Sequence, residues 1–190
     1  MTYSSDVQPI AVSEWDPRLA PIVAEMRGRP LNVHKLMANN PELLLAWWNF
    51  RKHVVGGGKL QQRHRELIIL RVAVHMKCWY EWASHVDRGL KSGLSLDEIE
   101  CVRFGRVATC WNQGDEFVLR ATDEVFDKQQ ITPETRTAMC AYFTPAELMD
   151  LIAICGAYIT LGTMINTWGL ELDEFIRAED GMDNNSWLRA

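Results

Sequence analysis

Apolar residues recur at intervals of three and four along most of the chain, most plainly over residues 43–55 (LLLAWWNFRKHVV). That spacing places them on one face of an α-helix, and no segment shows the sustained apolar-polar alternation of a β-strand. Residues 67–74 (LIILRVAV) are apolar on nearly all sides. They predict a central helix that is packed on every face, in which Arg71 needs a polar partner. The pattern therefore predicts an all-α fold.

A capping residue followed by proline marks a helix start, because the capping side chain accepts a backbone N–H and proline suits the first turn. Such pairs stand at Asp16-Pro17, Asn40-Pro41, Thr132-Pro133 and Thr144-Pro145. Glycines that follow apolar segments, among them Gly28, Gly93 and Gly169, fit helix ends. We therefore expect helices at residues 17–27, 41–55, 62–75, 78–92, 96–104, 114–128, 133–143 and 145–168. The glycine run 56–58 is predicted to be a loop and a flexible joint.

The length and composition fit one globular domain, since the chain has 190 residues, of which 47% are hydrophobic and 24% charged. The net charge of -5 and the lack of a Lys/Arg cluster argue against a nucleic-acid partner. No export signal is recognisable at the start. The longest apolar run, Leu151–Ile165, falls short of the ~20 residues that a membrane-spanning helix needs. We therefore expect a cytoplasmic protein without membrane contact.

The five cysteines are scattered without paired spacing and form no CxxC motif, which fits free thiols in a reducing compartment. Cys101, Cys110, Cys140 and Cys155 stand at apolar positions and are interpreted as structural. The fifth cysteine belongs to an unusual segment, residues 77–85 (KCWYEWASH). This segment combines a cysteine, two tryptophans, a tyrosine, a glutamate and a histidine, and is therefore where we look for chemistry.

On a helix that starts near Cys78, the spacing of Cys78, Glu81 and His85 puts these side chains on one face, which Trp82 shares. Glu66 lies on the preceding helix and can approach the same face if the two helices fold back on each other. A carboxylate within reach of an imidazole tunes its proton affinity, so that the pair can move a proton to or from a substrate. Cys78 would feel the positive end of the helix dipole, which favours its thiolate.

Each of these residues also has a purely structural interpretation. A single histidine such as His85 is more often a hydrogen-bonded packing residue than a catalyst. The aromatic side chains of Trp79, Tyr80 and Trp82 fit a hydrophobic core or a subunit interface. The case for chemistry therefore depends on several of them meeting at one place.

Two further histidines, His64 and His75, fit surface or helix-cap positions. The ligand types of His75, Cys78, Glu81 and His85 are those that bind zinc or iron. Their spacing matches no closed metal site, so we expect no metal.

Residues 63–100 (RHRELIILRVAVHMKCWYEWASHVDRGLKSGLSLDEIE) closely resemble the carboxymuconolactone decarboxylase family, which is related to the alkylhydroperoxidase D group of all-helical proteins. The pattern of the peroxidase branch is a glutamate, eleven residues, a CxxC pair, three residues and a histidine. Glu66, Cys78 and His85 fall on the glutamate, first-cysteine and histidine positions of this pattern. Glu81 stands at the second cysteine position, which favours the decarboxylase-like branch, because the peroxidase chemistry needs a resolving thiol.

Residues 143–174 (FTPAELMDLIAICGAYITLGTMINTWGLELDE) also resemble the C-terminal helices of the decarboxylase-like branch, so that the resemblance spans about residues 41–175. It implies an alkylhydroperoxidase D-like helical domain there, with a central helix hairpin. Residues 1–40 would then be an N-terminal helical extension and residues 176–190 a tail. The resemblance further implies a cofactor-free homo-oligomer, commonly a trimer or hexamer, with its pocket close to a subunit contact.

The resemblance implies a lyase that removes carbon dioxide from a small carboxylated lactone or a related acid of aromatic catabolism. His85 would be the proton donor or acceptor, and Glu81 or Glu66 would orient it. Tyr80 and Trp82 would contact the substrate and exclude water. Such a reaction requires neither a metal nor a cofactor.

A cation should hold the substrate carboxylate, and the nearest arginines in the sequence are Arg71, Arg63 and Arg65. Two other functions stay open. One is a thiol-dependent oxidoreductase in which Cys78 is the redox thiol and an external thiol resolves it. The other is a non-catalytic oligomeric binding protein that keeps the scaffold without the chemistry.

Overall fold

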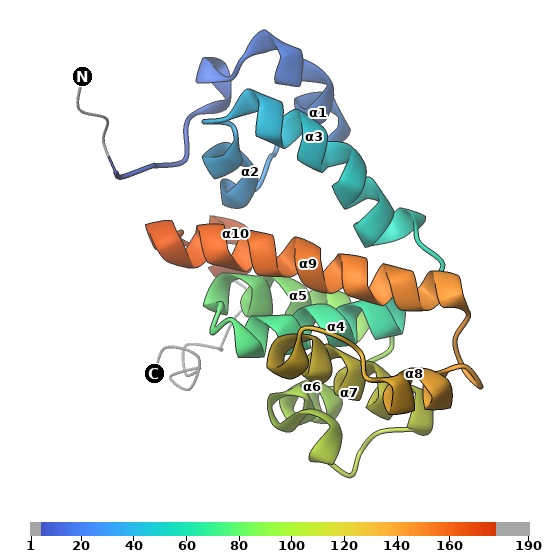
Figure 1. Cartoon of the computed structure of the whole chain (residues 1–190). Helices are drawn as coiled ribbons and strands as arrows, with labels where there is room; N and C mark the ends of the chain where they lie inside the picture. Colours follow the sequence, from blue (N-terminus) through green and yellow to red (C-terminus); the bar gives the residue numbers. More distant parts are fainter. Residues whose placement is uncertain (1–4, 178–190) are drawn as a thin grey trace.

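The computed structural model describes residues 5–177 of the chain. This part of the protein consists of helices and the turns between them, and it contains no strand (Figure 1). The all-α prediction is therefore confirmed. The tail predicted at residues 176–190 lies outside the described residues from position 178 onward.

The helical elements follow one another through short connections. In chain order they are the 3₁₀ turns Val12–Glu14 and Pro17–Leu19, α1 (Ala20–Glu25), α2 (Asn32–Met37), α3 (Pro41–Lys52), the π-helical turn His53–Gly57, α4 (Gln62–His75), α5 (Trp79–Lys91), α6 (Leu96–Cys101), the 3₁₀ segment Val102–Val107, α7 (Gln113–Lys128), α8 (Pro133–Met139), α9 (Pro145–Trp168) and α10 (Glu174–Arg177). Each predicted helix has a counterpart in this order. α2 has no counterpart among the predictions, because it is only six residues long and no side chain caps its start.

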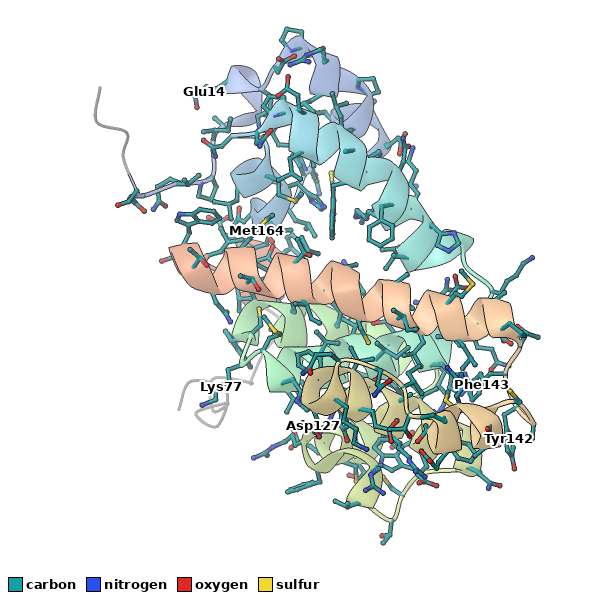
Figure 2. The ribbon with its side chains drawn as sticks, in the orientation of Figure 1. Glu14, Lys77, Asp127, Tyr142, Phe143 and Met164 are labelled. Carbon is teal, nitrogen blue, oxygen red and sulfur yellow. The ribbon has the colours of Figure 1, made fainter. Side chains whose placement is uncertain are left out.

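The helix α4 is central, as its apolar sequence predicts. Leu67, Ile68 and Leu70 are fully buried, and α4 packs against α5, α7 and α9. Figure 1 shows α9 crossing the molecule between two parts. On one side lie α1, α2 and α3, which we call the N-terminal lobe, and on the other lie α4 to α8. In Figure 2, side chains of α3 and α9 extend into the space between these two helices.

The glycine run between α3 and α4 is not the flexible loop that the sequence predicts. α3 continues into the π-helical turn His53–Gly57, and the carboxylate of Asp150 on α9 then accepts the backbone N–H groups of Lys59 and Leu60. Gly58 lies so close to this carboxylate that a Cβ there would stand 2.7 Å from Asp150 Oδ2. The joint is thus packed and hydrogen-bonded, and glycine permits the close approach.

Two of the four cysteines interpreted as structural are exposed. Cys110 and Cys140 are on the surface, Cys101 is half-buried and Cys155 is buried. The reason is local: α8 ends at Met139, and Cys110 lies in the turn that precedes α7. Neither of the two exposed cysteines therefore sits on the apolar face of a helix.

The helix α9 is long and apolar enough to cross a membrane by length and composition alone, the one such helix within residues 5–177. It has 24 residues because the capping box of Thr144 and Glu147 starts it well before the apolar run. The length argument drawn from that run is therefore wrong. Half of the most apolar window of α9 is buried inside the fold, as in the core helix of a globular domain. The absence of membrane contact stays a prediction.

Candidate active site

The hairpin of α4 and α5 brings Glu66 and His85 into direct contact. The turn between the helices includes Lys77, whose φ of 50° helps to reverse the chain, and α4 and α5 then pack side by side. His85 Nδ1 lies 2.7 Å from Glu66 Oε2, and each of the two side chains is only 3% exposed. Gln62, one turn earlier on α4, donates to the other carboxylate oxygen of Glu66 at 2.7 Å. The helix hairpin that the resemblance implies is thus present, and it brings Glu66 to the face of α5 that carries His85.

The hydrogen bonds of His85 determine which ring nitrogen carries the proton. Arg88 Nη1 lies 3.0 Å from Nε2 of His85, and the hydroxyl of Tyr158 lies 3.2 Å from the same atom. A guanidinium group has donors and no acceptor, so Nε2 must accept and Nδ1 carries the proton that it donates to Glu66. Burial and the charge of Arg88 lower the pKa of His85, against the opposing effect of Glu66. His85 is therefore a neutral imidazole whose unprotonated nitrogen is Nε2.

Glu81 is the second carboxyl group of the site. Its Oε2 lies 3.6 Å from His85 Nε2, and its side chain is buried. Burial raises the pKa of Glu81 to about 7, although the charges of Arg88 and Arg51 lower it. This carboxyl group therefore gains or loses its proton near neutral pH. A carboxyl group that titrates near neutral pH thus lies beside the unprotonated nitrogen of His85.

Two adjoining hollows open beside His85. The His34 hollow, lined by His34 but not by Glu66, has a volume of about 40 Å³. The Glu66 hollow, lined by Glu66 but not by His34, has a volume of about 140 Å³. Six residues line both: Arg51, Val54, Val55, His85, Arg88 and Tyr158. Since an apolar cavity of about 150 Å³ can take up benzene, the Glu66 hollow has room for a single ring.

Three side chains that line both hollows are not among the site residues predicted from the sequence. Arg88 follows His85 by three residues and Glu81 precedes it by four, so the helical spacing rule that groups Glu81 with His85 also identifies Arg88. Arg51 comes from α3 and Tyr158 from α9, and no local pattern links either residue to the hairpin. Burial lowers the pKa of Arg51 and raises that of Tyr158.

Arg71 does not reach either hollow, which corrects its predicted role in holding the substrate. Its Nε donates to Asp123 Oδ1 at 2.5 Å, and Nη1 donates to the carbonyl oxygens of Val102 and Arg103 at 2.9 Å. Asp123 also binds His75 Nε2 at 2.7 Å. Arg71 thus has the polar partners that its place in an apolar helix requires, and its bond to Asp123 links α4 to α7.

The other two predicted arginines differ from each other. Arg63 Nη2 lies 2.8 Å from Asp115 Oδ2, and Arg63 lines neither hollow. Arg65 lines the Glu66 hollow, and its Nε and Nη1 atoms are buried without a hydrogen-bond partner. Of the three arginines nearest in sequence, Arg65 is therefore the one beside the site.

Cys78 and Trp82 lie outside both hollows, although the helical spacing predicts that they face the site. Trp82 is part of the hydrophobic core. Cys78 is 1% exposed, and burial together with the charge of Glu81 raises the pKa of its thiol to about 12. The prediction of a thiolate-like Cys78 is therefore wrong, because desolvation outweighs the helix dipole. Tyr80 does line the His34 hollow, and its hydroxyl donates to Asp173 Oδ2 at 2.6 Å.

The two other histidines considered in the sequence, His64 and His75, lie outside both hollows. His64 Nε2 lies 3.4 Å from Asp115 Oδ1 and its ring packs edge-on against Phe143. His75 stacks on Phe126 with ring centroids 4.3 Å apart. Across residues 5–177, no three His, Cys, Asp or Glu side chains gather closely enough to hold a metal ion.

One segment of the chain matches a known protein family in sequence. Residues 41–124 match the sequence profile of the carboxymuconolactone decarboxylase family. This match covers less than half of the chain, from the start of α3 into α7. The matched segment contains Glu66, Glu81 and His85, as well as Arg51 and Arg88.

Solved structures of similar fold extend over nearly the whole chain. The debrominase Bmp8 in complex with 2,3,4-tribromopyrrole is 14% identical, with a TM-score of 0.75, and the match covers 94% of this chain and 97% of that one. The alkylhydroperoxidase AhpD core of an uncharacterized peroxidase-related protein from Ralstonia eutropha is 16% identical, with a TM-score of 0.76 and coverages of 91% and 96%. A peroxidase-related protein from Silicibacter sp. is 19% identical, with a TM-score of 0.73 and coverages of 93% and 97%.

At these identities the solved structures show a shared fold and leave the reaction open. No curated protein matches the chain. Parts of the site also come from beyond the segment that matches the family, because His34 precedes residue 41 and Tyr158 follows residue 124. The matched segment therefore contains the hairpin with Glu66, Glu81 and His85, whereas two walls of the cavity are built by other parts of the chain.

Proposed function

We propose that this protein is a lyase that removes carbon dioxide from a small carboxylated ring, such as a lactone of aromatic catabolism, by cofactor-free acid-base catalysis. The observation that carries the proposal is the buried contact of Glu66 with His85, beside a cavity that is also lined by Arg51 and Arg88. A base whose tautomer is held by a carboxylate is the arrangement that proton transfer requires.

In the proposed reaction the carbon–carbon bond to the carboxylate breaks and carbon dioxide leaves. The electron pair stays on the ring and is delocalised into its conjugated carbonyl group, until a proton reaches the ring carbon. Glu81 holds that proton near neutral pH, and His85 Nε2 passes it on, while Glu66 stabilises the imidazolium that forms transiently. The proton lost by Glu81 is then replaced from water.

The arginines supply the charge that this chemistry needs. Arg51 and Arg88 line both hollows, so that either can hold an anionic oxygen of a ring that sits beside His85. Hydrogen bonds from a guanidinium to a carboxylate or to a developing enolate are among the strongest that a side chain makes. They would stabilise the negative charge that collects on the ring carbonyl when carbon dioxide leaves.

The size of the cavity supports a single-ring substrate. The Glu66 hollow, at about 140 Å³, is close to the volume that accommodates benzene. The debrominase Bmp8, which shares the fold, binds 2,3,4-tribromopyrrole, a five-membered ring. A five-membered lactone ring is therefore a reasonable size for this site, and brominated pyrroles belong in the set of compounds to be tested.

The test is a turnover assay with carboxylated lactones, other ring-derived acids and a brominated pyrrole, followed by NMR of the products. We expect one of the carboxylated rings to lose carbon dioxide. The variant His85→Ala should lower the rate by roughly 100- to 10,000-fold, the usual contribution of a general acid-base group. His75→Asn is the matched control, because His75 binds Asp123 outside both hollows. Equal rates for wild type and His85→Ala would contradict the proposal.

The same assay separates the lyase from a thiol peroxidase. A buried Cys78 whose thiol has a raised pKa is poorly suited to attack a hydroperoxide. We therefore expect no turnover of alkyl hydroperoxides with an added thiol, and no loss of lyase activity in Cys78→Ser. A hydroperoxide activity that disappears in Cys78→Ser would favour the oxidoreductase instead. The homo-oligomer, trimer or hexamer, and the cytoplasmic location also stay proposals.

A further inference from the structure

Buried polar atoms without a partner are concentrated around the cavity. Within residues 5–177, six buried side-chain nitrogen or oxygen atoms lack a hydrogen-bond partner. Five of them belong to residues that line one of the two hollows: His34 Nδ1, Trp47 Nε1, Ser84 Oγ, and Nε and Nη1 of Arg65. Since folded proteins rarely leave such atoms unsatisfied, this concentration points to a ligand with matching polar groups.

Three of these atoms belong to residues of the His34 hollow and come from three helices. His34 lies on α2, Trp47 on α3 and Ser84 on α5. The ring of His34 packs edge-on against Trp48, with centroids 5.6 Å apart, and this contact fixes its orientation. Ser84 stands one residue before His85 on α5, so a group bound at this end of the cavity lies next to the proposed proton-transfer site.

The chemistry of the three atoms favours a neutral oxygen as their partner. An indole N–H only donates, a serine hydroxyl donates or accepts, and a neutral imidazole nitrogen does one or the other. Burial lowers the pKa of His34 to about 3, with smaller effects of Arg51 and Arg88, so the ring is uncharged at neutral pH. A hydroxyl or carbonyl oxygen satisfies such a set, whereas the anionic group of the substrate is better served by the two arginines.

We propose that His34, Trp47 and Ser84 form a specificity subsite that binds a hydroxyl or carbonyl oxygen on the ring acid whose charge Arg51 and Arg88 hold. This inference rests on the proposed function, because it assumes a ring acid in the cavity. The ring occupies the Glu66 hollow, and its oxygen substituent enters the His34 hollow, whose 40 Å³ is enough for a small group or a few waters. The three residues determine which ring acid binds and leave proton transfer to the hairpin.

The test compares the affinity of the full chain for benzoate with its affinity for 2-, 3- and 4-hydroxybenzoate by isothermal titration calorimetry. We expect at least one hydroxybenzoate to bind roughly three- to tenfold more tightly than benzoate, which is the net effect of one buried hydrogen bond. Trp47→Phe and Ser84→Ala each remove one polar atom and keep most of the side-chain shape. Each should reduce that preference while leaving the affinity for benzoate within about twofold.

Trp111→Phe is the matched control, because Trp111 Nε1 donates to the carbonyl of Gly105 away from the cavity. It should keep the preference of the wild type. A wild type without preference, or a preference that survives in both Trp47→Phe and Ser84→Ala, would overturn the subsite and indicate that water occupies these atoms. Failure of every acid to bind would overturn the subsite and the proposed carboxylate recognition together. If the subsite behaves as expected but the protein has no lyase activity, the proposed reaction is wrong and the subsite is kept.

Discussion

At the scale of single residues, the site depends on where one proton resides among Glu66, Glu81 and His85. The hydrogen bonds hold a proton on Nδ1 of His85 against Glu66, and Nε2, which accepts from Arg88, carries none. Glu81 is then the group that gains or loses a proton near neutral pH, because burial raises its pKa to about 7. Its titration should be visible in the stability of the protein, independently of any reaction.

The sign of this effect follows from the shift. Glu81 has an ordinary pKa of 4.5 and a folded-state pKa of about 7. A raised pKa stabilises the fold fully below about pH 4.5, and this contribution is lost as the pH rises through about 7. The difference corresponds to roughly 3 kcal/mol. We therefore expect Glu81→Gln to leave the free energy of unfolding unchanged near about pH 4 and to raise it by up to roughly 3 kcal/mol near about pH 8.

Urea unfolding at both pH values measures this difference. Glu100→Gln is the matched control, since Glu100 is exposed on α6, and it should change the free energy of unfolding equally little at either pH. A Glu81→Gln protein that is no more stable than the wild type above neutral pH would show that Glu81 ionises without difficulty in the folded state.

At the scale of helices, helical spacing predicts the places of Glu81 and His85 but not those of Cys78, at the edge of α5, and Trp82, within it. Glu81 and His85 share a face that also carries Arg88, as a step of about 100° per residue requires. Cys78 precedes the first residue of α5 and has non-helical backbone angles, φ -98° and ψ 92°. Helical geometry therefore does not apply to it. Trp82 follows Glu81 by one such step, which is enough to turn it into the core.

The joint between α3 and α4 gives a prediction about a single methyl group. Gly58→Ala would place a Cβ 2.7 Å from the Asp150 carboxylate, which is fixed by two backbone N–H groups. We expect a loss of roughly 1–3 kcal/mol in the free energy of unfolding, as for other overpacked sites. Thermal or urea unfolding measures it.

Gly56→Ala is a stringent control for that experiment, because a Cβ at Gly56 would have no atom within 4 Å. Alanine there should be neutral or stabilise by up to about 1 kcal/mol, since it restricts the unfolded chain. Equal destabilisation by Gly56→Ala and Gly58→Ala would mean that the glycine run is needed for its backbone freedom and that the contact with Asp150 is unimportant.

At the scale of the whole molecule, the cavity is closed by contacts that no local pattern contains. Asp173, just before α10, accepts the backbone N–H of Asn32 at 3.0 Å and the hydroxyl of Tyr80 at 2.6 Å. One buried carboxylate thus joins the N-terminal lobe, the hairpin and the C-terminal segment. Helix signals in a sequence extend over a few residues, which is why they predict α3, α4 and α9 but not the places where these helices meet.

This link can be tested by hydrogen exchange. Asp173→Ala leaves the Asn32 N–H and the Tyr80 hydroxyl without their buried acceptor, which costs about 1–3 kcal/mol. We expect amide exchange in α2 to become roughly tenfold faster or more, with little change in α4. Glu174→Ala, an exposed neighbour, should leave α2 unchanged. Uniformly faster exchange in all helices would instead indicate that Asp173 supports the fold as a whole.

The division of labour between the hairpin and its surroundings has a consequence for how such proteins diversify. The groups proposed to move a proton sit together on α4 and α5, whereas His34 and Trp47 come from the N-terminal lobe and Tyr158 from α9. Under the proposed function, substitutions in α2, α3 and α9 can change which ligand binds while the residues of α4 and α5 stay the same. Proteins with this fold can thus acquire new substrates through mutations around the hairpin, while the type of reaction is kept.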